Sequence, residues 1–96
     1  MYFSNDDNWY DVYVYVWSDA GNKVAWPGEA MTYVKTNSQG QKIYKITLET
    51  GKYTNIIFNN GTVQTVDLSL SNTKNEGFYT TTMSGGQYLC ETYIYS

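Results

Sequence analysis

Hydrophobic and polar residues alternate with a period of two along much of this chain, which is the period of a β-strand. The clearest run is residues 9–17, where three valines alternate with three aromatic residues: Val12, Val14 and Val16 against Tyr13, Tyr15 and Trp17. Because successive side chains of a strand point to opposite faces, this run predicts a valine face packed in a core. Its other face is predicted to be a row of flat rings.

Clusters of Gly, Asn, Asp, Ser and Pro interrupt the alternating runs at short intervals, and no segment shows a sustained helical period. The runs between these turns are rich in β-branched and aromatic residues, which are typical of strands. They predict strands at 9–17, 31–36, 41–49, 52–59, 63–70, 77–83 and 87–95. About seven to eight short strands in 96 residues predict an all-β fold, a single antiparallel β-sandwich.

The segment 48–53 has the features of a tight hairpin, with Gly51 supplying a positive φ between two strands. In the strand that precedes it, alternation places Tyr44, Ile46 and Leu48 on one face. The sequence therefore predicts that the strands before and after Gly51 pair with each other.

Charge excludes two classes of partner. Six basic residues against nine acidic ones give a net charge of −3, so the chain lacks the clustered Lys and Arg that a nucleic acid or a membrane surface requires. No apolar run approaches the roughly 18–20 residues of a membrane span. We predict neither nucleic acid nor membrane as partner. We expect residues 1–96 to be one monomeric module, excised from a larger multidomain protein.

Catalytic chemistry is poorly represented. The chain has no histidine, and its nine acids fall mostly on turns or exposed strand positions, whereas glycoside hydrolysis needs two carboxyl groups held across a cleft. We therefore predict no enzymatic activity and no cofactor. The oxygen-rich turn at residues 5–8 is explained by Asx turns without a bound Ca²⁺. The lone Cys90 is predicted to be a buried structural thiol.

Eleven tyrosines and three tryptophans are the feature that needs an explanation. Tyr13 and Tyr15 lie two residues apart on one predicted strand, so their rings project in parallel about 7 Å apart. They could form a second buried face or an exposed binding surface. We favour exposure, because a two-layer sandwich buries one face of each sheet and tyrosine suits half-wet surfaces. Trp26, in the turn Ala25-Trp26-Pro27-Gly28, is either a plug under the sheet edge or a preorganised contact surface; periodicity does not decide between them.

Four segments in this order and spacing resemble family 26 carbohydrate-binding modules, the starch-binding modules appended to bacterial α-amylases and related surface proteins. The segments are residues 9–17, 25–32 with the motif AWPG, 53–61 with IFNNG, and 64–68. The resemblance spans residues 2–79 and is weaker from Thr80 onward. It implies a β-sandwich with an exposed site formed by early-strand tyrosines and the AWPG tryptophan.

On this resemblance, the ligand-binding residues are Tyr13, Tyr15 and Trp26, and the expected partners are starch, amylopectin and maltooligosaccharides. We assign Lys23, near the turn, and Gln64, after Asn59-Asn60-Gly61, as polar contacts. The resemblance also implies a non-catalytic role that targets a parent amylase or surface protein to starch, outside the cell or on its surface. The alternative is a protein-binding or adhesion module that uses the same tyrosine face.

Overall fold

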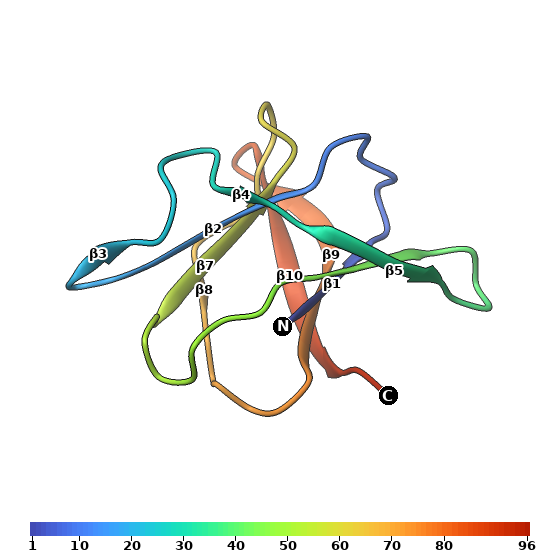
Figure 1. Cartoon of the computed structure of the whole chain (residues 1–96). Coiled ribbons are helices and arrows are strands. Elements are labelled where there is room, and N and C mark those ends of the chain that lie inside the picture. The colour runs from blue at the N-terminus through green and yellow to red at the C-terminus, as the bar shows by residue number, and fades with distance from the viewer.

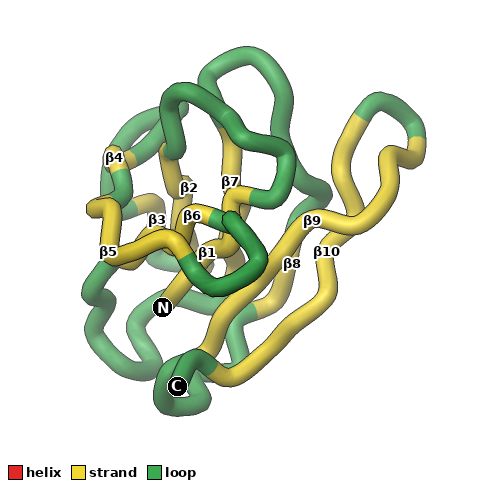
Figure 2. Tube along the Cα trace, turned by 90° about the vertical axis from the view of Figure 1, so that its right-hand side faces the viewer, coloured by secondary structure: helices red, strands yellow, loops and turns green.

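The computed structural model describes all 96 residues as a two-layer β-sandwich without helices (Figures 1 and 2). Its strands are β1 (Tyr2–Asn5), β2 (Tyr13–Ser18), β3 (Gly21–Asn22), β4 (Glu29–Ala30), β5 (Thr32–Thr36), β6 (Lys42–Lys45), β7 (Asn55–Asn59), β8 (Leu68–Ser69), β9 (Glu76–Ser84) and β10 (Gln87–Ile94). Sheet A has the order β10-β9-β1-β6-β5. Sheet B has the order β3-β2-β7-β8, with β4 also paired to β2. The predicted all-β sandwich is confirmed. Since the structure has no helices, it contains no helix that could span a membrane.

One parallel pair brings the two ends of the chain into the same sheet. β1 pairs with β9 in parallel, whereas the other strand pairs are antiparallel. The rings of Tyr2 and Tyr95 stack with centroids 4.0 Å apart. Figure 2 shows the two termini near each other and the β9–β10 hairpin projecting from the body.

The predicted valine face forms the centre of the core. Val12, Val14 and Val16 keep no more than 5% of their surface exposed. They share one core cluster with Phe3 of sheet A and Phe58 of sheet B, whose rings stack across the sandwich at 4.3 Å between centroids. Burial of such side chains stabilises the fold by roughly 1.5–3 kcal/mol each.

The predicted hairpin at 48–53 is wrong as a strand pairing, although the turn is present. Gly51 has a φ of 78°, and the amide of Lys52 donates to the carbonyl of Glu49 at 3.2 Å. However, β6 before the turn belongs to sheet A and β7 after it belongs to sheet B. Local turn chemistry reverses the chain direction, but the strands that pair are chosen by distant segments, β1 for β6 and β2 for β7.

The first predicted strand begins four residues too early. Both side-chain amide atoms of Asn5 bond the backbone of Trp9, at 2.9 Å to its carbonyl and 2.8 Å from its N–H, and these bonds hold residues 5–9 in a loop. The two acids of this turn are also engaged, Asp6 with Ser4 and Asp7 with Thr80. The oxygen-rich turn therefore has a structural use within the fold. The strands β1, β3 and β4 were not predicted, because each is short and has no repeated alternation.

Candidate functional site

An open row of aromatic rings lies on the outer face of sheet B. Tyr13, Tyr15 and Trp17 alternate along β2 with the buried valines, and each is half-buried. β2 pairs with β7 in the register Tyr13↔Asn59, Tyr15↔Ile57 and Trp17↔Asn55. Directly opposed residues share a face, so Ile57 lies beside Tyr15 on the outer face, where only 6% of its surface remains exposed. The row therefore has an apolar floor on the neighbouring strand.

The loop between β3 and β4 adds a fourth ring to this row. Trp26 keeps 47% of its surface exposed. Its ring centroid lies 5.4 Å from that of Tyr15 at an interplanar angle of 63°, while Trp17 lies 5.3 Å from Tyr15 at 38°. Tyr15 is thus flanked by two tryptophans at different inclinations. We call Tyr13, Tyr15, Trp17 and Trp26 together the aromatic platform.

Tight backbone packing holds the Trp26 loop in place. Gly28 donates its N–H to the carbonyl of Ala25 at 2.8 Å, and the side chain of Asn59 donates to the carbonyl of Pro27 at 2.9 Å. A Cβ on Gly28 would lie 2.1 Å from the carbonyl oxygen of Val14, and φ here is 103°. Only glycine allows the loop to approach β2 this closely. The tryptophan is therefore presented on a backbone fixed to two strands.

Gln64 reaches the same face through the turn that follows β7. Within that turn, the side chain of Asn59 accepts from Gly61, and that of Asn60 accepts from Thr62 and Val63, which gives the turn a structural role. Gln64 then pairs with Asn59. Because Asn59 is opposite Tyr13, Gln64 lies on the platform side, two strand spacings or about 10 Å from Tyr13.

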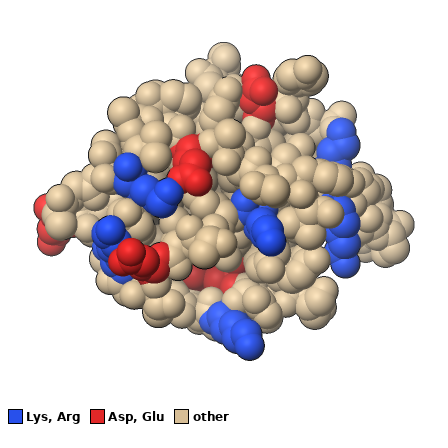
Figure 3. All heavy atoms as spheres, in the orientation of Figure 1, with Lys and Arg blue, Asp and Glu red and all other residues tan.

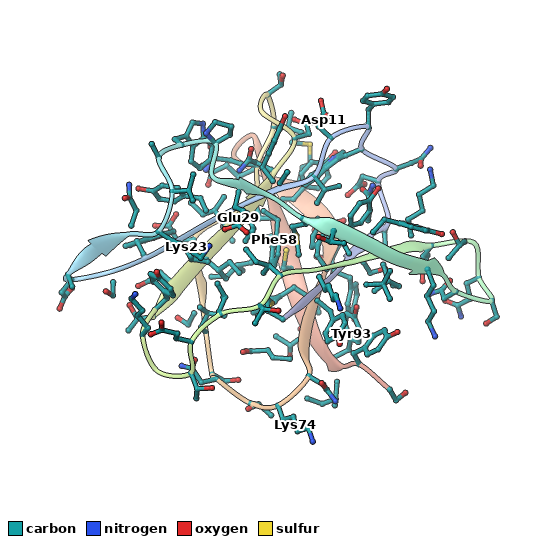
Figure 4. The ribbon with its side chains drawn as sticks, viewed as in Figure 1. Asp11, Lys23, Glu29, Phe58, Lys74 and Tyr93 are labelled. Atoms are coloured by element: carbon teal, nitrogen blue, oxygen red, sulfur yellow. The ribbon has the colours of Figure 1, made fainter.

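Lys23 is not brought together with the aromatic rings. Its ammonium pairs with Glu29, and Glu29 lies opposite the buried Val14 in the β2–β4 pair, which places both charges on the core side of sheet B. Figure 4 shows the two side chains meeting each other. Lys23 also lines two surface hollows with Lys52 and Tyr53, away from the platform. The ion pair links the two ends of the Trp26 loop.

Asn22, which the sequence analysis did not single out, occupies the place expected for Lys23. It is opposite Trp17 in the β2–β3 pair, and its amide donates to the hydroxyl of Tyr15 at 3.1 Å. The bond orients the Tyr15 ring and leaves the phenolic hydrogen free to donate. The pairing of a two-residue strand decides which of Asn22 and Lys23 faces the rings, and no local pattern reports that pairing.

Charged side chains are not a feature of the aromatic platform. Figure 3 shows acidic and basic side chains spread over the visible face rather than gathered in one patch, and no group of three or more His, Cys, Asp or Glu side chains is placed to hold a metal ion. Cys90 packs against the core, and burial, together with Asp7 and Glu91, raises its pKa to about 12. A thiol that stays protonated is not a nucleophile. The site offers flat apolar rings edged by amides and hydroxyls.

Comparison with known proteins agrees with this geometry. Residues 1–70 match the family described as starch-binding module 26. The matched segment contains the whole aromatic platform, the Trp26 loop and Gln64. No solved structure matches the chain.

A curated relative points in the same direction. An α-amylase of Butyrivibrio fibrisolvens is 38% identical over 74 residues, which cover 71% of this chain and 7% of the amylase. The chain therefore spans only a small part of the relative that it matches.

Proposed function

Because the chain belongs to the starch-binding module 26 family, whose members are binding modules and not catalysts, we propose that its aromatic platform binds α-1,4-glucan chains by ring stacking. The observation that carries the proposal is the pair of Tyr15 and Trp26, 5.4 Å apart and inclined at 63°, with Trp26 half exposed on a rigid loop. Tyr13 extends the surface along β2.

The chemistry of a glucose unit suits such a surface. A sugar ring has apolar C–H faces and a rim of hydroxyl groups, so flat side chains cover the faces while amides, hydroxyls and water satisfy the rim. Rings inclined at 63° and 38° to Tyr15 follow a bent chain better than a flat ribbon, for which coplanar rings are suited. The platform therefore favours an α-linked glucan over a β-linked one.

Polar contacts come from the edges of the platform. We assign this role to Asn22, whose carbonyl oxygen has no partner within the protein, and to Gln64, whose amide makes only one long bond of 3.4 Å to the carbonyl of Thr65. Lys23 acts indirectly in this proposal, because its pair with Glu29 links the ends of the Trp26 loop.

A shallow exposed site limits affinity. We expect dissociation constants in the micromolar-to-millimolar range, about −4 to −8 kcal/mol. In the proposed setting, residues 1–96 form a monomeric module of a larger secreted or surface protein and hold it on starch, amylopectin and maltooligosaccharides. Companion modules on the same polypeptide would raise retention through effective concentration, without any new contact.

Migration in amylopectin gels and titration calorimetry with maltoheptaose test the proposal. Trp26→Ala should weaken binding at least tenfold, or about 1.4 kcal/mol, because it removes the largest exposed ring of the site. Tyr10→Ala, which removes a ring that is 97% exposed and outside the platform, is the matched control and should bind within about twofold of the wild type. Wild-type retention by Trp26→Ala would contradict the platform as the binding site and favour the alternative of a protein-binding surface. Equal affinity for a β-glucan would contradict the selectivity for α-linked chains. No release of reducing sugar is expected.

A further inference from the structure

A recess lies on the outer face of sheet A, on the opposite side of the sandwich from the aromatic platform. It encloses about 250 Å³ and is lined by Ser4, Asp6, Asn37, Gln39, Gln41, Ile43, Tyr79 and Tyr93. One water occupies about 30 Å³ of liquid, so the recess has room for a small ring molecule rather than for a single ordered water. Two of its walls, Tyr79 and Tyr93, lie outside the residues 1–70 that match the family.

The strand register of sheet A places several of the residues that line the recess on the outer face. Tyr79 is opposite Ser4 across the β1–β9 pair, and Ser4 is opposite Ile43 across β1–β6, so these three residues share the outer face. Tyr93 is opposite Gly77. A Cβ at Gly77 would lie 2.6 Å from the Tyr93 ring, so the missing side chain is what lets that ring lie down on the sheet. The two tyrosine rings are 6.2 Å apart at 49°.

The turn between β5 and β6 supplies a rim of amides. The side-chain oxygen of Asn37 accepts from the backbone of Gln39 at 3.0 Å and of Gln41 at 2.9 Å, and its nitrogen donates to the side-chain oxygen of Gln41 at 2.8 Å. These bonds hold the turn rigid. They leave the amide nitrogen of Gln41 and the whole side-chain amide of Gln39 without a partner in the protein.

One of the lining residues, Tyr93, carries a hydroxyl group without a partner in the protein. The hydroxyl oxygen of Tyr93 is buried and makes no hydrogen bond, the one side-chain atom of the protein in that state. Buried polar groups are nearly always satisfied, and an unpaired one is costly. Burial raises the pKa of Tyr93 to about 12, helped by the negative field of Asp6 and by Tyr95 and Tyr2. The phenol therefore keeps its proton as a donor.

We propose that this recess is a second saccharide site that takes one glucose-type unit of a neutral sugar. Tyr79 and Tyr93 offer ring faces to the C–H surface of the sugar, Gln39 and Gln41 donate to its hydroxyl oxygens, and the carboxylate of Asp6 accepts from a hydroxyl. A single carboxylate and no lysine among the lining residues disfavour both an anion and a divalent metal ion. With the platform on the opposite sheet, the module would contact two glucan chains, or two parts of one chain, at once.

NMR titration with maltotriose on the Trp26→Ala variant tests this site separately from the platform. The backbone amides of Gln39, Gln41, Tyr79 and Tyr93 should shift and saturate, because the platform defect leaves sheet A untouched. In the same background, Tyr79→Ala should weaken the maltotriose affinity that these shifts report at least tenfold. Tyr10→Ala, which changes a tyrosine that is 97% exposed and outside the recess, should leave that affinity unchanged. If Tyr79→Ala does not fold, Gln41→Ala replaces it, and the same loss of maltotriose affinity is expected.

The two proposals fail in different ways. Unchanged recess amides at saturating maltotriose, or equal shifts with and without Tyr79 and Gln41, would overturn the second site. Failure of the platform proposal would appear instead in the wild type, as unchanged amides around Tyr15 and Trp26. Each result can occur without the other.

Discussion

The two outer faces of the sandwich use tyrosine in different ways. On sheet B, Tyr15 stands in an open row beside Trp26, which is 47% exposed. On sheet A, Tyr93 lines a recess together with residues of the β5–β6 turn, and its hydroxyl is buried. The residue type is the same, and the difference comes from the loops and turns next to each sheet. The Trp26 loop and the turn after β7 edge the open face, whereas the N-terminal turn and the β5–β6 turn border the recess on the other face.

The largest expected difference between the two faces comes from replacing one glycine on each side, Gly28 near the platform and Gly77 near the recess. Gly28→Ala would place a Cβ 2.1 Å from the backbone oxygen of Val14 at a φ of 103°, and backbone cannot move aside. We expect a loss of about 2–4 kcal/mol in the free energy of unfolding, and loss of amylopectin retention. Gly77→Ala meets a side chain instead, the Tyr93 ring, which can shift. Its expected cost is about 1–2 kcal/mol, with amylopectin retention kept.

Thermal unfolding and amylopectin gels measure both glycine variants. If amylopectin gels still retained Gly28→Ala, or no longer retained Gly77→Ala, the assignment of one glycine to each face would be wrong.

Neighbouring positions on β2 separate binding from stability within the open face. Val14 is 1% exposed, so Val14→Ala should cost about 1–3 kcal/mol of stability and leave the maltoheptaose affinity of the folded protein unchanged. Tyr15→Ala should weaken that affinity about tenfold with a small change in melting temperature. If Tyr15→Ala unfolds the domain while Val14→Ala is silent, the two faces of β2 are inverted.

Alkaline titration examines two partly buried groups of β10. The pKa values of Cys90 and Tyr93 are both raised to about 12, chiefly by burial, from ordinary values of 9.0 and 10.0. A raised pKa means that the fold favours the protonated group, so this stabilisation is complete below pH 9 and is lost as the pH rises toward 12. Melting temperature should fall across that window, with a later onset in Cys90→Ala. In the folded protein, Tyr93→Phe should remove a late step from the tyrosinate absorbance titration; loss of an early step would place Tyr93 in solvent.

The smallest expected effect is that of pH and salt on the platform. Tyrosine, tryptophan, asparagine and glutamine carry no group that ordinarily titrates between about pH 5 and 9. Maltoheptaose affinity should therefore be nearly flat across that range and insensitive to salt, since a neutral sugar has no charge to screen. A steep change between pH 5 and 7 would require a carboxylate that the aromatic platform lacks.

Much of the fold follows from local patterns. The alternation of Val12, Val14 and Val16 correctly predicted a buried face on β2 and just before it, because a period of two places these side chains on one side of a strand. Turn residues such as Gly51 correctly marked where the chain reverses. They could not report which sheet the chain enters next, so the predicted hairpin between β6 and β7 was wrong.

By itself, the sequence determined the all-β class, the family and the ring-bearing strand, since these depend on spacing along the chain. Tertiary structure alone decided that Trp26 stands against Tyr15, that Asn22 rather than Lys23 faces the rings, and that Tyr79 and Tyr93 border a recess with Gln41. Each of these depends on the register of strands distant in sequence. A shift of one residue in register turns a side chain to the opposite face, and nothing in a local pattern encodes that choice.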